Sequence, residues 1–103
     1  MNKETPLTEA VYYILLAVRE PNHGYGIIQD VFDMTDGRVN LGQGTLYGAI
    51  NSLLEKGGIK LYSEEKESRK KKSYIITSLG VEVFKKEVIR LNELIKNGEK
   101  MGV

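Results

Sequence analysis

Residues 44–58, GTLYGAINSLLEKGG, are the most informative part of the chain because they predict a helix with a single apolar face. Its apolar positions follow the 3.6-residue helical period throughout: Leu46, Ala49, Ile50, Leu53 and Leu54. Gly57 and Gly58 end the pattern, as glycine commonly does after a helix. With its opening at Gly42, this helix is expected to span residues 43–56.

The periodicity changes from helical to alternating directly after this helix. Ile59–Tyr62 predicts one strand, and Ser73–Ile76 predicts a second strand that returns beside it. The segment between them is basic, because residues 60–72 hold six Lys or Arg and three Asp or Glu. We therefore expect a β-hairpin with a basic wing over residues 63–73.

Two shorter helices are predicted before residue 43. Thr8 is a good N-cap for the first helix, which Pro21 is expected to stop. The second helix is expected to run from Tyr25 to Thr35, after a turn over residues 22–24 in which His23 caps the helix. Residues 39–41 alternate enough to predict a very short strand.

The order of these elements points to a winged helix-turn-helix, in which the third helix enters the DNA major groove and the hairpin reaches the flanking backbone. The expected fold class is mainly α with a small β-hairpin. At 103 residues, the chain has room for one core. We expect residues 1–77 to form the DNA-binding part and residues 78–103 to form a C-terminal dimerisation helix of the same continuous domain.

The face of residues 43–56 opposite the apolar stripe is expected to contact DNA. Thr45 and Tyr47 suit phosphate contacts near the helix N-terminus, and Asn51 suits the edge of an adenine. Gly48 has no structural need to be glycine in mid-helix, which indicates the close approach of a partner. The predicted DNA contacts combine this face with the wing: Gln43, Thr45, Tyr47, Asn51, Ser52, Lys56, Arg69, Lys70, Lys71 and Lys72.

The recognition helix is almost free of charge. Residues 44–55 contain no Lys or Arg, and Glu55 is acidic, so most of the attraction for phosphate must come from the wing. This neutrality keeps a second interpretation open, in which the same fold is a protein-interaction module that binds no DNA. The two interpretations differ in salt dependence, because binding through phosphates weakens steeply as the salt concentration rises.

The last helix, expected from residue 78 to about residue 97, carries a heptad pattern typical of helix pairing. Its seam consists of Val81, Phe84, Val88, Leu91 and Ile95. A helix of ~20 residues is ~30 Å long and extends beyond a body of three short helices. The first helix is also apolar on its outer face, at Tyr12, Tyr13 and Leu16. We therefore expect a homodimer that pairs through both helices and reads a palindromic operator in double-stranded DNA.

The composition argues against several other functions. The chain has no Cys and a single His, which argues against a disulfide framework, thiolate catalysis and a zinc site. No nucleophile is paired with a base, so we expect no enzyme activity, no cofactor and no metal. No apolar run approaches the ~20 residues of a membrane span, and no signal peptide opens the chain. We expect a cytoplasmic, nucleoid-associated protein without membrane contact.

Three motifs resemble those of a known family. His23–Ile28 (HGYGII), Gly44–Ile50 (GTLYGAI) and Leu54–Gly57 (LEKG) are similar to motifs of the PadR family of bacterial transcriptional regulators. The resemblance covers the chain from Leu7 to about Leu91. It implies a winged-helix homodimer, with the first and last helices at its interface, that represses genes by binding palindromic operators. It also implies that some members release DNA on binding phenolic acids or hydrophobic drugs.

Departures from the family pattern bear on function. Asn51 or Ser52 stands where a basic residue is common, and Gly58 stands where a larger apolar residue is common, which is expected to loosen the step into the wing. The chain has no Trp, the residue with which some relatives stack flat drugs. A pocket for a small aromatic effector between protomers would then be lined by Tyr12, Tyr13 and Leu16, unless these side chains only pack the dimer.

Overall fold

The computed structural model describes residues 6–64 and 72–103. Its elements, in chain order, are α1 (Glu9–Ala17), β1 (Asn22–His23), α2 (Gly24–Met34), α3 (Gln43–Lys56), β2 (Ile59–Glu64), β3 (Lys72–Ile76), α4 (Ser78–Gly98) and the short 3-10 helix η1 (Glu99–Met101). The chain is thus mainly helical, with a small antiparallel sheet, as the sequence predicted. The helix predicted at residues 43–56 is confirmed at both ends.

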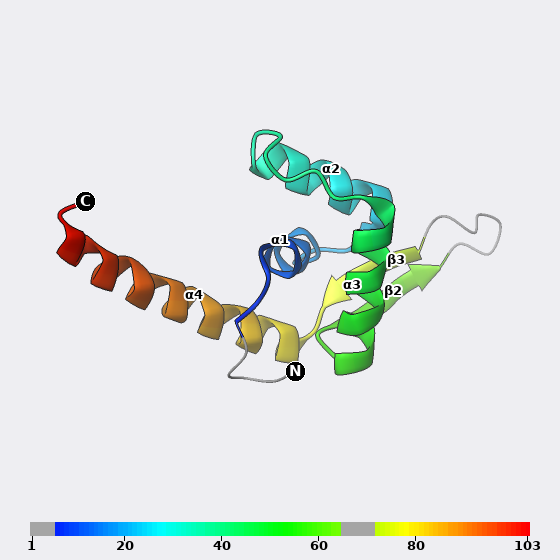
Figure 1. Ribbon diagram of the computed structural model, residues 1–103. Coiled ribbons are helices and arrows are strands. Elements are labelled where there is room, and N and C mark those ends of the chain that lie inside the picture. The colour runs from blue at the N-terminus through cyan, green and yellow to red at the C-terminus, as the bar shows by residue number, and fades with distance from the viewer. Residues whose placement is uncertain (1–5, 65–71) are drawn as a thin grey trace.

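One apolar core joins α1, α2, α3 and the sheet. Its fully buried side chains come from α1, the residue that ends α1, α2, α3 and β2: Ile14, Leu15, Val18, Ile27, Val31, Leu46, Ile50 and Ile59. Burying such side chains contributes about 1.5–3 kcal/mol each to folding. The apolar stripe predicted for α3 points into this core at Leu46, Ile50 and Leu53. The opposite face of α3 therefore faces away from the core (Figure 1).

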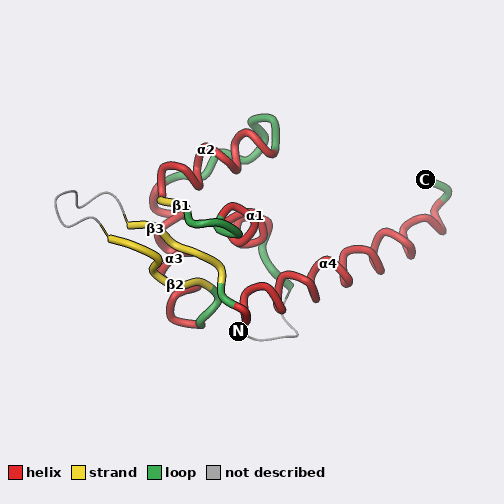
Figure 2. The backbone as a smooth tube through the Cα atoms, turned by 180° about the vertical axis from the view of Figure 1, so that it is seen from behind, coloured by secondary structure: helices red, strands yellow, loops and turns green. Residues whose placement is uncertain are grey.

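The sheet has three strands, in the order β1-β3-β2 (Figure 2). β2 and β3 form the predicted hairpin, with Ile59 opposite Ile76 and a register shift between Leu61 and Ser63. β1 adds two residues on the other side of β3, with Asn22 opposite Tyr74. The central strand therefore connects the base of the wing to the start of α2.

The strand predicted at residues 39–41 is wrong, and the third strand lies where a turn was predicted. Residues 39–41 have no strand partner, and the N–H of Val39 donates to Oγ1 of Thr35 instead. Leu41 is buried in the core, which explains the apolar alternation without a strand. β1 is too short to show a pattern of its own, and it is extended because β3 pairs with it.

The ends of α1 and α2 are set by contacts that involve few residues. α1 ends at Ala17, earlier than the stop predicted at Pro21, and the carbonyl of Val18 accepts a hydrogen bond from Ile76 of β3 (2.9 Å). The predicted cap of α2 is confirmed, because Nδ1 of His23 accepts from the N–H of Gly26 (3.1 Å).

The step from α3 into the wing is held closely to α4. Gly58 is buried, its carbonyl accepts from the N–H of Thr77 (3.1 Å), and the Thr77 hydroxyl donates to the Gly57 carbonyl (2.6 Å). A Cβ on Gly80 would collide with the Gly58 carbonyl. Gly58 therefore takes part in a tight backbone contact, whereas the sequence predicted a loosened step.

α4 leaves the body after its first turns and projects away from it, at the end of the molecule opposite the hairpin (Figure 1). The molecule accordingly measures 56 × 28 × 21 Å. The inward side of α4 consists of Gly80, Val83 and Glu87. Of the predicted seam, Phe84 packs partly on the core, whereas Ile95 is 61% exposed.

The described residues offer neither a membrane-spanning helix nor a cluster of metal ligands. No helix within residues 6–64 and 72–103 is long and apolar enough to cross a membrane. In the same ranges, no three acidic or His side chains gather in a way that could hold a metal ion.

Candidate nucleic-acid interface

The N-terminus of α3 is open. Its N-cap is Gly42, and no side chain caps the first turn, so the backbone N–H groups of that turn are available to an anion. A Cβ on Gly42, Gly44 or Gly48 would meet no atom within 4 Å. The chain itself therefore gives no steric reason for glycine at these three positions, and the helix surface along them is bare backbone.

A hollow of about 620 Å³ lies between α2, α3 and β3, beside this surface. Four of the ten predicted DNA contacts line it together: Gln43, Tyr47, Asn51 and Lys72. The first three follow at intervals of four residues along one flank of α3, and Lys72 is the first residue of β3. The fold thus brings the base of the wing and the recognition helix to a single concave surface.

The other predicted contacts on α3 lie on its opposite flank. Thr45 and Lys56 are exposed and Ser52 is half-buried, and none of the three lines the hollow. Their spacing of seven and four residues places them along one helical line. Arg69, Lys70 and Lys71 of the wing lie outside the described residues.

Tyr47 is positioned by a glycine on the neighbouring helix. A Cβ on Gly24 would collide with the Tyr47 hydroxyl, so only glycine lets this ring lie over the start of α2. Tyr47 remains 43% exposed in this position. The HGYG and GTLY motifs are therefore partners in space, since the first makes room for the tyrosine of the second.

Sequence reasoning missed three residues of the hollow: Tyr25, Ile28 and Tyr74. Tyr25 was predicted only as the start of the second helix, and its side chain is 73% exposed. The adjacent HGYG motif does not settle its exposure, because burial of an aromatic residue at a helix start depends on what packs above it. Tyr74 is buried in the central strand and forms the floor of the hollow.

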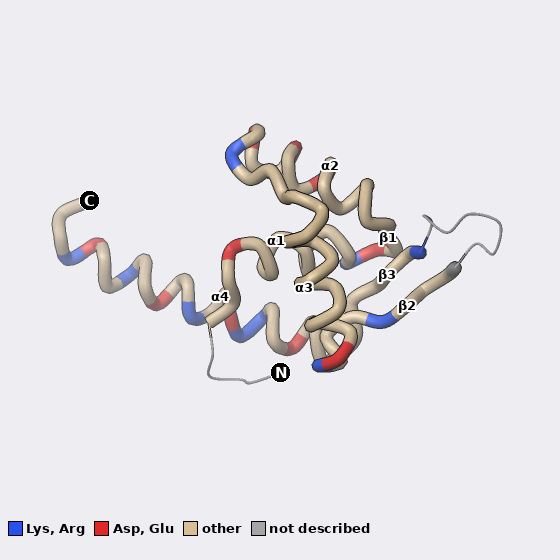
Figure 3. Tube along the Cα trace, turned by 45° about the vertical axis from the view of Figure 1, so that its right-hand side comes forward, with Lys and Arg blue, Asp and Glu red and all other residues tan. Residues whose placement is uncertain are grey.

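The interface is polar but nearly neutral on the helix side. Figure 3 shows α3 without charge over most of its length, with acidic and basic residues only near its C-terminal end. The cations of the described hairpin are Lys60 on β2 and Lys72 on β3, both exposed. Of these two cations, Lys72 lines the hollow, on its hairpin side.

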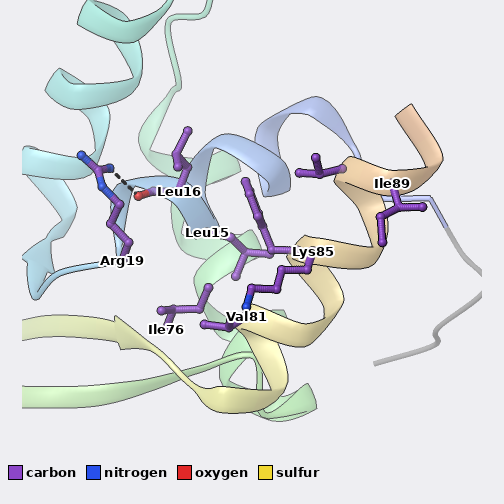
Figure 4. Close-up of a pocket in the computed structure, with 9 residues that line it drawn as sticks. Leu15, Leu16, Arg19, Ile76, Val81, Lys85 and Ile89 are labelled. Carbon is purple, nitrogen blue, oxygen red and sulfur yellow. Dashed lines mark hydrogen bonds between the residues drawn. The ribbon is translucent and has the colours of Figure 1, made fainter. Parts of the chain in front are cut away.

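A second, apolar groove of about 570 Å³ lies between α1 and α4 (Figure 4). Its lining combines α1, the end of β3 and α4: Leu15, Leu16, Arg19, Ile76, Val81, Phe84, Lys85, Val88 and Ile89. Three of the five predicted seam residues are among them: Val81, Phe84 and Val88. Leu91 is half-buried and Ile95 exposed, farther along α4.

The three predicted effector-pocket residues are divided by this groove. Leu16 lines it, and its carbonyl accepts from Nη1 of Arg19 (2.8 Å). Tyr12 is not part of the lining but stacks on Phe84, with ring centroids 4.6 Å apart. Tyr13 meets Tyr12 edge-on at 5.6 Å and packs partly on the core.

Comparison with known proteins decides the family. The model of the Transcriptional regulator PadR-like family matches residues 14–86, which is more than half of the chain. The chain belongs to the PadR-like family of transcriptional regulators. The match spans both motifs that meet at Tyr47 and the whole hairpin. No curated protein matches the sequence.

Solved structures agree with this PadR-like assignment. A transcriptional regulator from Clostridium thermocellum is 25% identical, with a TM-score of 0.76 over 89% of this chain and 90% of that one. A PadR family regulator from Eggerthella lenta is 23% identical, with a TM-score of 0.74 over 88% and 79%. A PadR-like transcription factor from Bacteroides fragilis is 22% identical, with a TM-score of 0.72 over 89% and 87%.

The family assignment bears on what the protein binds and on whether it is an enzyme. PadR-like proteins are DNA-binding transcriptional regulators and not enzymes, so the expectation that this chain is no enzyme is confirmed. The same assignment favours DNA over the protein-interaction module as the partner of this chain.

Proposed function

We propose that this protein is a homodimeric, sequence-specific repressor that reads a palindromic operator with α3 and holds the flanking backbone with its wing. The observation that carries the proposal is the hollow in which Gln43, Tyr47, Asn51 and Lys72 meet. It combines amide side chains for base edges with a tyrosine and a lysine for phosphates. The open N-terminus of α3 adds free backbone N–H groups on the same side.

The dimer is supported by the apolar groove and by the helix that extends beyond it. α4 carries exposed apolar side chains past the end of the body, among them Ile89 at 67% and Leu94 at 51% exposed. A second copy that placed the same part of its α4 against the groove would bury both surfaces at once, and a two-fold axis makes this arrangement self-complementary. Two recognition helices would then face two half-sites.

The test is binding of the purified protein to a duplex from its own upstream region and to a shuffled duplex, at low and at physiological salt. We expect a preference for the native duplex that persists at physiological salt. Equal, salt-sensitive binding to both duplexes would overturn sequence-specific regulation. Binding to neither would favour the protein-interaction module, which the neutral α3 keeps as the second candidate.

Asn51→Ala makes the test specific to the hollow. Loss of a bidentate base contact removes about 1–3 kcal/mol of discrimination, so the preference for the native duplex should fall about tenfold or more while binding to the shuffled duplex stays unchanged. Asn97→Ala, at the exposed end of α4, is the matched control and should keep the wild-type preference. An unaltered preference in Asn51→Ala would mean that the bases are read elsewhere.

Release by a small aromatic effector is the remaining part of the proposal. The Tyr12–Phe84 stack beside Leu16 offers an aromatic surface at the edge of the apolar groove. Titration of the protein–operator complex with a phenolic acid tests this part, and release should need a higher acid concentration in Leu16→Ala, once operator binding by this variant is established, if the groove is the binding site. If the complex survives saturating phenolic acid, the groove serves only to pack the dimer and does not bind an effector.

A further inference from the structure

Glu87 is the last point at which α4 is held by its own body. The inward side of the helix consists of Gly80, Val83 and Glu87, and every residue from Val88 to Val103 is half-buried or exposed. Glu87 is 6% exposed, and among the residues that the structure describes it is the one charged side chain that is buried. An apolar residue would be the ordinary choice at such a position.

The carboxylate of Glu87 connects α4 to the segment that begins α1. Its Oε2 accepts from the backbone N–H of Leu7 (3.0 Å), across 80 positions of sequence. Arg90 donates to both oxygens, from Nε to Oε1 (2.6 Å) and from Nη2 to Oε2 (2.9 Å). Leu7 itself packs on the core, and the next residue, Thr8, caps α1 by accepting from the N–H of Val11 (3.1 Å).

This connection restricts geometry more than an apolar contact would. A hydrogen bond to a backbone N–H requires a donor–acceptor distance near 2.7–3.2 Å and a nearly straight angle, whereas apolar side chains tolerate sliding. A tilt of α4 keeps the Arg90 pair, which lies on the same helix, but it leaves the Leu7 N–H without its acceptor, so tilts that break this bond are penalised. The Arg90 side chain is 37% exposed, so within this network the bond to the Leu7 N–H is the one that joins α4 to the segment before α1.

We propose that Glu87 is a positioning residue for operator recognition: its bond to Leu7, made by a carboxylate that Arg90 holds in place, fixes the direction in which α4 leaves the body, and through the dimer it fixes the distance between the two recognition helices. This inference rests on the proposed dimeric function.

The geometry of α4 amplifies small changes at Glu87. From Glu87 to the end of α4 at Gly98, the helix rises about 16 Å at ~1.5 Å per residue. A tilt of about 10° at Glu87 therefore displaces that end by about 3 Å, close to the ~3.4 Å between successive base pairs. Half-sites of helix-turn-helix dimers lie about one DNA turn apart, so a shift of this size changes the spacing that fits.

The first test measures the direction of α4 without DNA. The chain has no Cys, so Asp33→Cys on α2 and Lys96→Cys on α4 introduce two labelling sites, and spin-labelled protein mixed with an excess of unlabelled protein reports the distance within one protomer. We expect one narrow distance distribution for the wild-type background. Glu87→Leu should widen the distribution at least twofold, with a thermal melt confirming that the variant is folded at the temperature of the measurement.

Two further variants keep this test decisive. Glu82→Gln removes an exposed carboxylate that pairs with Lys86 (3.3 Å) on the same helix, and it should leave the distribution narrow. Glu87→Gln retains an acceptor for the Leu7 N–H, so it should fold even if Glu87→Leu does not, and should widen the distribution less. A narrow, unshifted distribution in both Glu87 variants would overturn the proposal.

The second test measures operator spacing, with palindromic duplexes whose half-site separation is changed one base pair at a time. Wild-type protein and Glu82→Gln should prefer one spacing at least tenfold over its neighbours. Glu87→Leu should prefer it less than threefold, with unchanged affinity for a single half-site. An undiminished preference in Glu87→Leu would overturn the link to DNA. If the wild type binds no duplex, the proposed function and this link both fail, whereas the spin-label result still decides whether Glu87 directs α4.

Discussion

Gly48 is a residue whose role divides between folding and binding. A Cβ at this position would meet nothing in the protein, and glycine in the middle of a helix costs about 0.5–1 kcal/mol relative to alanine. Gly48→Ala should therefore raise the free energy of unfolding by about that amount. If DNA backbone approaches α3 there, the same variant should bind the operator at least tenfold more weakly.

Paired denaturation and DNA-binding titrations check the Gly48 prediction. Gly98→Ala, at the end of α4 with equally open surroundings, is the control and should leave operator affinity unchanged. A variant Gly48→Ala that is more stable and binds normally would show that DNA does not approach this part of the helix.

Glu87 also predicts a pH dependence of stability. The paired guanidinium of Arg90 lowers the pKa of the Glu87 carboxyl below its ordinary value of 4.5, against the opposing effect of burial and with help from the Leu7 N–H. A carboxyl with a lowered pKa in the folded state adds stability above its ordinary pKa, and the addition is lost as the pH falls through the folded-state value.

Glu87→Gln, which does not titrate, isolates this effect. We expect it to be about 1–2 kcal/mol less stable than the wild type at pH 7, and the difference should shrink as the pH falls below 4.5. Urea denaturation between pH 7 and pH 3 measures the difference. A difference that stays constant over this range would mean that the ionised form of Glu87 adds no stability.

At the scale of elements, the hairpin supplies charge that α3 lacks. Lys72→Ala should weaken binding to all duplexes alike and reduce the slope of log K against log salt by about 1, because one phosphate contact is lost. Lys86→Ala, on α4 and paired with Glu82, is the matched control and should keep the slope. Fluorescence anisotropy at four or more salt concentrations measures both, and an unchanged slope in Lys72→Ala would place the phosphate contacts elsewhere.

The elements also show what could be predicted from sequence. α3 was predictable to the residue, because an unbroken apolar period lies between glycines at both ends. β1 was not, because two residues carry no period and only pairing with β3 makes them a strand. On the candidate site, sequence identified Gln43, Tyr47, Asn51 and Lys72 but missed Tyr25, since burial of a helix-start aromatic depends on what packs above it. Glu87 was not identified either, because a charge one position before a seam residue resembles a solvent-facing heptad charge.

At the scale of the whole molecule, the part of α4 beyond Glu87 is the surface on which the proposed dimer depends. Leu91 lies on the predicted seam beyond Glu87 and is half-buried in a single chain. Leu91→Glu should therefore yield monomers in sedimentation analysis and should lower operator affinity at least tenfold, because two half-sites no longer bind together. Asn92→Glu introduces the same charge at an exposed neighbouring position and should remain dimeric. A dimer that survives Leu91→Glu would confine the seam to packing within one chain.

The glycines of this chain differ in what they would tolerate from mutation. Gly80 lies against the backbone carbonyl of Gly58, so even the single methyl group of alanine has no room there, whereas a methyl group on Gly24 would meet the Tyr47 hydroxyl and push this partly exposed ring aside. Gly42, Gly44 and Gly48 face open space along the outer surface of α3. A saturation library scored once for cellular abundance and once for operator occupancy should thus separate Gly80, depleted in both screens, from Gly42, Gly44 and Gly48, depleted only where DNA must fit.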